Sequence, residues 1–355
     1  MSDIETADGI SRREFLKAGV GLAAVTSGLE LIAGCAATET PKDRIIPTKE
    51  KSDYKIYPPK DGCLVGFHKE QNRRFQVGEG ISTTIHHYRN ALGANPAILA
   101  FWSFLSLGFP LAEAKTIRKN SIVPYVNVMP GHEGWRPSFG PDDVVQGRCD
   151  SYIKRLATDA AGFGEKHGSF FFTTMVEFNA GWWPWSRKPD TTPAWRHIWQ
   201  IFEEQGANQY ATWVWEAFCP EKYQISVTDP EPYYPGDKYL DWIGINVFAN
   251  LKNPYIGQNT MFKELMSKTY EQMLRNHPQK TIMVSEFGRT PGSSQPPWLI
   301  DAYRSIENDF PPIRAAIYYD NITNVLTGQD HTLDRKSLGT LKEIFKDPYW
   351  IMAAK

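Results

Sequence analysis

The sequence lacks an excess of charge of either sign. Its 355 residues contain 39 Lys and Arg against 40 Asp and Glu, which gives a formal net charge of −1. Proteins that bind nucleic acid through phosphate contacts normally present a basic surface, so we expect no nucleic-acid partner. No strand-like run is followed by a GxGxxG or GxxxxGK[ST] motif, which argues against the common nucleotide-binding folds.

Cysteine is also scarce, with four residues in the whole chain. No CxxC pair and no local His/Cys spacing gathers the three or four ligands that a metal site needs, so we expect no metal and no cofactor. Cys63, Cys149 and Cys219 are an odd number, which permits at most one disulfide. We expect three small buried side chains, although an oxidising compartment would allow one bridge.

The N-terminus contains no run that is long and apolar enough for a transmembrane helix. The sequence SRREFLK at residues 11–17 fits the twin-arginine export motif, and a short apolar stretch rich in Gly and Ala follows it. Residues 31–35, LIAGC, then predict a lipobox in which Cys35 carries the lipid. We therefore expect a signal peptide over residues 1–35 and an exported lipoprotein, anchored in the membrane and facing the periplasm or the cell exterior. The alternative for Cys35 is an ordinary thiol beside a simple cleavage site.

Residues 36–61 are rich in Pro, Lys, Asp, Glu and Thr and contain few apolar runs. This composition predicts a flexible tether. The remaining residues, 62–355, are expected to form one catalytic domain.

Eight short apolar runs follow the tether, and helix-like stretches such as residues 141–166, 194–205 and 261–275 lie between them. Apolarity within each run is nearly continuous, which is typical of strands buried on both faces of a parallel sheet. Eight strands alternating with helices predict a single (β/α)8 barrel, a fold of about 250 residues or somewhat more. The apolar runs lie at residues 63–68, 97–105, 122–129, 170–178, 211–218, 240–248, 280–287 and 313–320.

Two of these runs carry a glutamate near their C-terminal end. Glu177 follows the sequence FFFTTMV, and Glu286 follows TIMVS. The carboxyl ends of barrel strands meet at one face of the fold, and a retaining glycosidase needs two carboxyl groups there, one as acid/base and one as nucleophile. The competing interpretation is that both glutamates are surface residues at strand ends.

Aromatic residues are abundant, with 12 Trp, 16 Tyr and 19 Phe. Most of them would fill the core. Trp182, Trp183 and Trp185, however, directly follow Glu177, where flat apolar rings suit stacking on sugar rings. We expect at least one of the three to be an exposed platform for substrate.

Four segments of the chain resemble glycoside hydrolase family 26, the β-mannanase family within the clan of (β/α)8 retaining glycosidases. The resemblance covers roughly residues 62–345, and the YPGD…DWIG spacing is its most specific part. The segments are EFNAGWWPW (177–185), AWRH (194–197), YPGDKYLDWIG (234–244) and SEFG (285–288).

The resemblance implies that Glu177 is the acid/base and that Glu286 is the nucleophile. Glu177 must then be protonated at the start of the reaction, so we expect its pKa to be raised by apolar surroundings and by the charge of Glu286. Three positions depart from the family pattern. Val176 replaces the histidine that usually precedes the acid/base, Phe248 stands where a tyrosine often faces the nucleophile, and the last strand, ending at Tyr319 and Asp320, lacks the common tryptophan.

Further residues complete the expected site. Asn179 and Phe248 are assigned to substrate binding, and either Arg289 or a neighbouring hydroxyl is expected to stabilise an ionised Glu286. Glu216, at the end of the fifth strand, is expected either to hydrogen-bond a sugar hydroxyl or to be a solvated rim residue.

The loop after the third strand contains His132 and Trp135, which lie where barrels of this family bind substrate. His68, at the end of the first strand, is expected to be a packed rim residue rather than a catalyst.

The expected activity is retaining hydrolysis of internal β-linkages in a polysaccharide, most directly a β-1,4-mannan, by a monomer without a cofactor. A related β-glycan and a polysaccharide made by the organism itself remain competitors as substrate. Two other functions stay open. One is a glycan-binding lipoprotein on a catalytically degenerate barrel, and the other is a transglycosylase or trimming enzyme in exopolysaccharide assembly.

Overall fold

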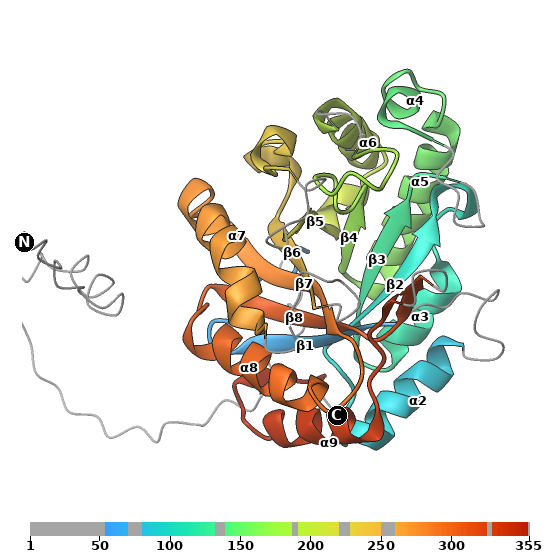
Figure 1. Cartoon of the computed structure of the whole chain (residues 1–355). Helices are drawn as coiled ribbons and strands as arrows, with labels where there is room; N and C mark the ends of the chain where they lie inside the picture. The colour runs from blue at the N-terminus through green and yellow to red at the C-terminus, as the bar shows by residue number, and fades with distance from the viewer. Residues whose placement is uncertain are drawn as a thin grey trace, which may run out of the picture. The chain divides into compact units, whose positions relative to one another are not determined.

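The fold is a closed barrel of eight parallel strands with helices between them (Figure 1). This computed structural model describes residues 54–69, 80–131, 139–186, 191–219, 228–249, 260–324 and 329–353. Each strand pairs in parallel with the next along the chain, and β1 pairs with β8 to close the barrel. The prediction of a single (β/α)8 barrel is confirmed.

The barrel strands match the predicted apolar runs closely. They are β1 (Cys63–His68), β2 (Ile98–Phe104), β3 (Val123–Met129), β4 (Phe170–Thr174), β5 (Ala211–Phe218), β6 (Trp242–Ala249), β7 (Thr281–Arg289) and β8 (Ile313–Tyr319). Short strands outside the barrel are β9 (Ile322–Asn324), β10 (Gln329–Asp330) and β11 (Trp350–Ile351).

Helices surround the strands (Figure 1). They are α2 (Ile81–Leu92), α3 (Leu111–Lys119), α4 (Pro141–Val145), α5 (Asp150–His167), α6 (Thr192–Glu204), α7 (Phe262–Asn276), α8 (Gln295–Asn308) and α9 (Arg335–Ile344). Single 3-10 turns are η2 (Leu105–Leu107), η3 (Ala207–Gln209), η4 (Glu231–Tyr233) and η5 (Asp237–Tyr239). Among the described residues, none of the helices combines the length and apolarity needed to cross a bilayer.

Two predicted boundaries were wrong. The helical stretch 141–166 is divided into α4 and α5, because Gly147 adopts a left-handed φ of 74° that ends the first helix. The fourth strand was expected to reach residue 178 but ends at Thr174, so Glu177 lies in the loop that follows.

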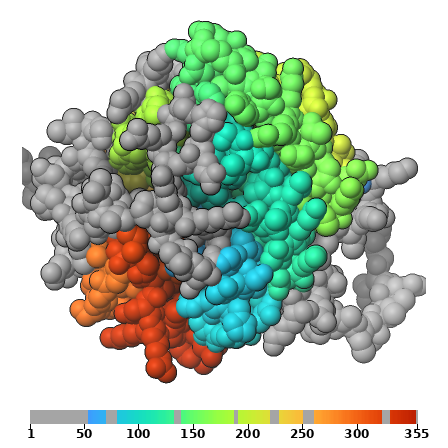
Figure 2. Space-filling model, turned by 90° about the vertical axis from the view of Figure 1, so that its right-hand side faces the viewer, coloured from blue at the N-terminus to red at the C-terminus, as the bar shows by residue number. Residues whose placement is uncertain are grey.

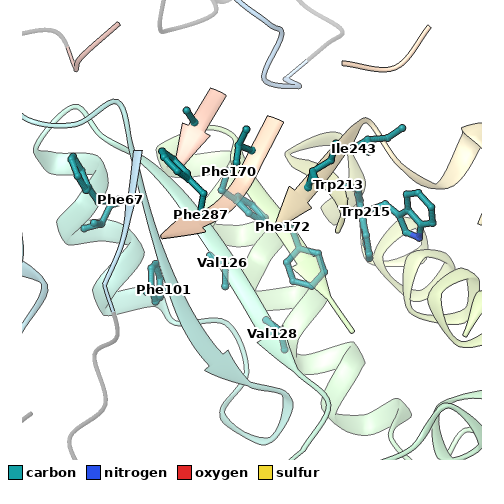
Figure 3. Packing of buried hydrophobic residues seen from close by; sticks show 14 of the residues in the cluster. Phe67, Phe101, Val126, Val128, Phe170, Phe172, Trp213, Trp215, Ile243 and Phe287 are labelled. Atoms are coloured by element: carbon teal, nitrogen blue, oxygen red, sulfur yellow. The ribbon is translucent and has the colours of Figure 1, made fainter. Parts of the chain in front are cut away.

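Most of the hydrophobic core fills the layer between the strands and the surrounding helices. Every second strand residue points outward into it, such as Val65 and Phe67 of β1. Figure 3 shows this layer with side chains from several strands packed together. Cys63, Cys149 and Cys219 are all buried and form no disulfide, as expected for three small buried side chains.

The inside of the barrel changes from apolar to polar along the strands. Toward the amino ends of the strands, the interior is a separate apolar cluster that includes Leu64, Val123, Phe171, Val214 and Trp242. Two or four residues further along the same strands, the inward positions carry polar groups. These buried polar residues are His68, Asn127, Thr173, Glu216 and Asn246. The polar end of the interior is the carboxyl end of the strands, where a barrel of this kind holds its site.

The end of the predicted tether is packed against the barrel. Lys55 donates to the carbonyl of Ala211 and lies 2.8 Å from Asp241, and the Ile56 amide donates to Thr212 Oγ1 at 2.8 Å. The Trp242 indole donates to the Ile56 carbonyl at 3.1 Å. Residues 54–57 therefore form a strap across the N-terminal ends of β5 and β6, and the prediction that flexibility extends to residue 61 was wrong. The rest of the predicted tether, and residues 1–35, lie outside the described residues.

Figure 2 shows the blue and cyan surface of the early helices beside the red surface of the C-terminal region. The contact reflects the pairing of β1 with β8, which brings the first and last parts of the barrel together. β11 adds to the same side, because Cys63 pairs with Trp350.

Helix α5 offers a matched test of packing with two glycines in one helix. A Cβ at Gly164 would overlap the ring of Tyr210, whereas a Cβ at Gly162 meets nothing within 4 Å. Alanine has a higher helix propensity than glycine by about 1 kcal/mol, so Gly162→Ala should stabilise the protein by up to that amount. Gly164→Ala should destabilise it by about 1–3 kcal/mol through overpacking. The shift of the urea denaturation midpoint measures both, and equal effects of the two substitutions would contradict this packing.

Candidate active site

Glu286 points into the barrel because β7 contains an extra residue. Ile245 of β6 pairs with Val284, but the next residue, Asn246, pairs with Glu286, so Ser285 is bulged out of the register. The pairing with β8 shifts at the same place. A bulge lets two consecutive side chains face the same side of a sheet, and Ser285 and Glu286 both contact inward groups.

The carboxylate of Glu286 is buried, with 4% of the residue exposed. His68 Nδ1 lies 2.6 Å from Glu286 Oε1, and the Asn127 amide donates to the same oxygen at 3.4 Å. An N–H group at either position stabilises the ionised carboxylate, which is the form that a nucleophile needs.

Arg289 was expected to stabilise Glu286, but the structure directs it elsewhere. Its guanidinium donates to Ser294 Oγ at 3.3 Å and to the Thr260 carbonyl at 3.1 Å. In contrast, His68, which was expected to be only a packed rim residue, contacts the carboxylate. The sequence signal for His68 was its place as the last residue of β1.

Glu177 is held in an unusual backbone conformation. It has a φ of 53°, and Met175 has a φ of 48°, both in the left-handed region that non-glycine residues seldom adopt. Its amide donates to the Glu216 carbonyl at 3.0 Å, and the Trp185 indole donates to the Val176 carbonyl at 2.8 Å. These contacts hold a turn that costs about 1–3 kcal/mol for each left-handed residue, and such strain is found most often at functional sites.

Three N–H groups converge on the Glu177 carboxyl group. Trp182 and Trp183 both donate from their indole nitrogens to Oε2, at 2.8 and 3.0 Å, and the Asn246 amide donates to Oε1 at 3.3 Å. Burial raises the pKa of Glu177, while the three hydrogen bonds act in the opposite direction. Burial is thus the main cause of the raised pKa, and the tryptophans limit it.

The three tryptophans divide into different roles. Trp182 is 39% exposed and can present a ring face to substrate, and Trp183 is half-buried. Trp185 is completely buried and stacks on Trp183 with ring centroids 4.9 Å apart. The assignment of Trp185 to substrate contact was therefore wrong, since it supports the turn from below.

Asn179 and Glu216 are also structural in position. Asn179 is 1% exposed, and its side-chain amide both donates to the Phe218 carbonyl, at 2.9 Å, and accepts from the Phe218 amide, at 2.8 Å. It thereby fixes the Glu177 turn to β5. Glu216 is fully buried in the barrel interior and receives a hydrogen bond from the Tyr125 hydroxyl. Glu216 is therefore not the solvated rim residue that was one of its two expected roles, and the contacts of both side chains are made within the protein.

An arc of aromatic rings surrounds the carboxyl groups. Neighbouring ring centroids along the arc lie 4.8, 6.3, 5.6, 5.0 and 5.5 Å apart. Its members come from the carboxyl ends of five strands and from the Glu177 turn, and in order they are Trp182, Phe218, Phe248, Tyr319, His68 and Trp102. Phe248 was expected in the site. Phe218, Tyr319 and Trp102 were not assigned, although each stands at or near the end of its strand.

The loop residues His132 and Trp135 lie outside the described residues, as does Cys35. Within the part of the chain that the structure describes, no three His, Cys, Asp or Glu side chains are grouped as a metal site requires.

The sequence and the geometry agree with what is known of other proteins. A family model described as Glycosyl hydrolase family 26 matches residues 142–352, which is more than half of the 355-residue chain. The protein belongs to glycosyl hydrolase family 26. The matched residues include Glu177, Glu286 and the three tryptophans, whereas His68 lies before them.

Two curated relatives are more distant in sequence. Endoglucanase H of Acetivibrio thermocellus is 27% identical over 196 residues, which cover 52% of this chain and 21% of that protein. Beta-1,3-xylanase TXYA of a Vibrio species is 24% identical over 196 residues, covering 53% of this chain and 40% of that one. The family 26 chain thus matches less than half the length of either relative.

Solved structures share the fold. A GH26 β-mannanase from Bacteroides ovatus superposes with a TM-score of 0.60 at 16% identity, covering 83% of this chain and 92% of that one. The GH26 domain of an endo-β-mannanase/endo-β-glucanase from Prevotella bryantii gives a TM-score of 0.59 at 12% identity, with coverage of 83% and 91%.

The indole hydrogen bonds to Glu177 provide a direct test of the site. Trp183→Phe removes an N–H group that stabilises the ionised carboxylate, so the pKa of Glu177 should rise, by about one unit for a hydrogen bond to a charged group. Trp185→Phe is the matched control, because its indole binds a backbone carbonyl and not the carboxyl group. It should lower stability and leave the pKa of Glu177 nearly unchanged. Carbon NMR of labelled glutamate carboxyls measures the pKa, and an unchanged value in Trp183→Phe would contradict the assignment.

Proposed function

We propose that this family 26 protein is a retaining glycoside hydrolase that cleaves internal β-linkages of a polysaccharide. The observation that carries the proposal is the pair of buried carboxyl groups at the carboxyl end of the barrel, held in contrasting surroundings. Burial favours the protonated form of Glu177. His68 and Asn127 surround Glu286 with nitrogen groups that favour the ionised form.

The proposed reaction has two steps. Glu286 attacks the anomeric carbon while Glu177 gives its proton to the glycosidic oxygen, so that the bond breaks and the leaving sugar departs as an alcohol. Water then attacks the glycosyl-enzyme ester, Glu177 accepts the proton of that water, and Glu286 is released as a carboxylate. Since Oε2 of Glu177 already accepts two indole hydrogen bonds, the proton to be transferred belongs on Oε1.

As substrate we propose a β-1,4-mannan or a related β-glycan. The exposed ring of Trp182 and the aromatic arc suit the flat faces of sugar rings, which is consistent with any of these polymers. The relatives support a β-glycan as a class, because their names refer to β-mannan, β-glucan and β-1,3-xylan.

The carboxyl roles are tested with two substitutions. Glu286→Ala should abolish turnover of polysaccharides and of activated aryl glycosides alike, since both need the nucleophile. Glu177→Ala should lose about 10²–10⁴-fold on polysaccharides, but much less in the first step on glycosides with activated leaving groups, and added azide should yield a β-glycosyl azide. Glu264→Ala, an exposed residue of α7, is the control and should match the wild type.

Reducing-end release from mannan, glucomannan, mixed-linkage glucan and xylan in the same assay identifies the polymer, with mannan or glucomannan expected to be cleaved fastest. Wild-type turnover of an activated glycoside by Glu286→Ala would refute the carboxyl roles. Fastest cleavage of xylan would overturn the expected preference for mannan and leave the carboxyl roles intact.

We also propose that the protein is exported by the twin-arginine route and anchored through a lipid on Cys35. The support is the order of sequence features, with a twin arginine at Arg12 and Arg13, an apolar run, and small residues before the cysteine. A diacylated cysteine holds a protein on a membrane stably, whereas one chain alone is marginal.

Cys35→Ala should therefore release active enzyme into the soluble fraction with unchanged kinetics. Replacement of Arg12 and Arg13 by Lys should leave the protein in the cytoplasm. Fractionation and N-terminal sequencing of the mature protein check both, and a mature N-terminus at any residue other than Cys35 would replace the lipoprotein with a simply secreted protein.

A further inference from the structure

A third carboxyl group lies beneath the two proposed catalytic glutamates, and the reaction does not use it. Glu216 is fully buried inside the barrel, and its side chain packs against the backbone of Gly244. A Cβ at position 244 would lie 2.8 Å from Glu216 Cγ and 2.5 Å from Ser285 Oγ. The glycine therefore leaves the space in which Glu216 and the residue before Glu286 meet.

The three carboxyl groups differ in the partners that surround them. Glu177 receives three N–H groups, and Glu286 lies against an imidazole and an amide. Glu216 Oε1 receives the Tyr125 hydroxyl, while its Oε2 has no hydrogen-bond partner in the described part of the chain. No Lys, Arg or His forms an ion pair with Glu216 among those residues. Of the three, Glu216 has the fewest donor groups at hydrogen-bonding distance among the described residues.

The polar atoms around Glu216 also favour its neutral form. The inward polar layer of the barrel contains an acceptor, Asn127 Oδ1, that is buried without a hydrogen-bond partner among the described residues. An ionised Glu216 would add only another acceptor to this layer, whereas a carboxylic acid supplies an O–H donor. Because buried acceptors without a donor are costly, the neutral acid suits this layer better than the carboxylate.

Asn246 connects Glu216 to the proposed acid/base. Its amide donates to Glu177 Oε1 at 3.3 Å, and the same side chain is near enough to Glu216 to lower the pKa of that carboxyl group. Ser285 donates to Asn246 Oδ1 at 2.6 Å and so fixes which end of the amide faces them. The sequence of contacts runs from Tyr125 through Glu216 and Asn246 to Glu177.

We propose that Glu216 keeps its proton at the pH at which the enzyme works, and that the neutral Tyr125–Glu216 pair positions Asn246 and through it Glu177. Glu216 is thus a positioning residue. With Glu177 protonated for the first step, a neutral Glu216 leaves Glu286 as the one charged carboxyl group of the three, so that Glu286 can ionise without a second buried charge nearby. This role rests on the proposed hydrolase function.

The electrostatic surroundings agree with this role. Burial is the first cause that raises the pKa of Glu216 well above its ordinary value, and the charge of Glu286 and, to a smaller extent, that of Glu177 raise it further. Burial and the neighbouring Glu216 likewise raise the pKa of Tyr125, so both partners of the pair stay protonated.

Two substitutions of similar size separate positioning from simple packing. Glu216→Gln keeps the polar contacts and the neutral charge, so it should retain kcat/KM within a few-fold, with both limbs of the pH profile moved by less than about half a unit. Glu216→Leu fills the space but cannot hold Asn246, so kcat/KM should fall about ten- to a hundredfold, mainly in kcat, and the basic limb should move. A downward shift of the basic limb by about one unit in Glu216→Gln would show that an ionised Glu216 had been raising the pKa of Glu177. That result would overturn the proposal, as would a Glu216→Leu variant that matches Glu216→Gln.

A spectroscopic measurement tests the proton without substrate. In the infrared difference spectrum between wild type and Glu216→Gln at neutral pH, the band lost should be the carbonyl stretch of a protonated carboxylic acid. Loss of carboxylate bands instead would overturn the proposal, even if Glu216→Leu fails to fold. If no polysaccharide is hydrolysed, the proposed function fails, while the infrared result still decides the state of Glu216.

Discussion

Three acidic side chains buried in one barrel would repel one another if all were ionised, and the structure is organised around this constraint. Each carboxyl group has its own surroundings, with indole and amide N–H groups for Glu177, an imidazole for Glu286 and a hydroxyl for Glu216. Together, the three carboxyl groups and their partners come from six strands, β1 and β3 to β7, or from the loops that follow these strands. The closed barrel is what allows chain segments so distant in sequence to meet within hydrogen-bonding distance.

The arrangement depends on local departures from regular structure, and the apolar core supports them. The bulge at Ser285 turns Glu286 inward while Phe287 continues into the outer core, where it packs among Phe262, Trp298 and Tyr303. The turn at Glu177 contains left-handed residues, and buried Trp185 and Asn179 brace it. Both glutamates thus depend in part on buried side chains that lie away from the mouth of the barrel. A change to one of these braces would alter the geometry of the site without touching a sugar.

The sequence predicted the positions of the barrel strands well. A continuous apolar run indicates a strand that is buried on both faces, and this does not depend on how the strand pairs with its neighbours. It also located Glu177 and Glu286, whose neighbours form recognisable runs. It could not reveal the bulge, because a strand buried on both faces has no alternation of apolar and polar residues whose phase one extra residue would shift. For the same reason the fourth strand was extended to residue 178, past the point where Met175 leaves the strand conformation.

Contacts between strands were the other information that the sequence did not contain. His68 and Glu286 are separated by more than two hundred residues, and only the pairing of β1 with β8 beside β7 brings them together. Trp182, Trp183 and Trp185 look equivalent in the sequence, yet the turn exposes the first and buries the last. Glu216 was assigned to the rim because it stands near a strand end, but its side chain is fully buried inside the barrel.

The strap at residues 54–57 lies at the end of the barrel opposite to the carboxyl groups. Its bonds to Ala211, Thr212 and Trp242 hold the entering chain at the amino ends of β5 and β6, while the carboxyl groups lie at the opposite ends of the strands. An eight-residue strand spans about 26 Å, so the point of attachment and the site are separated by nearly the thickness of the barrel. Any restraint on the chain at residues 54–57 therefore acts on the end of the barrel that the carboxyl groups do not occupy.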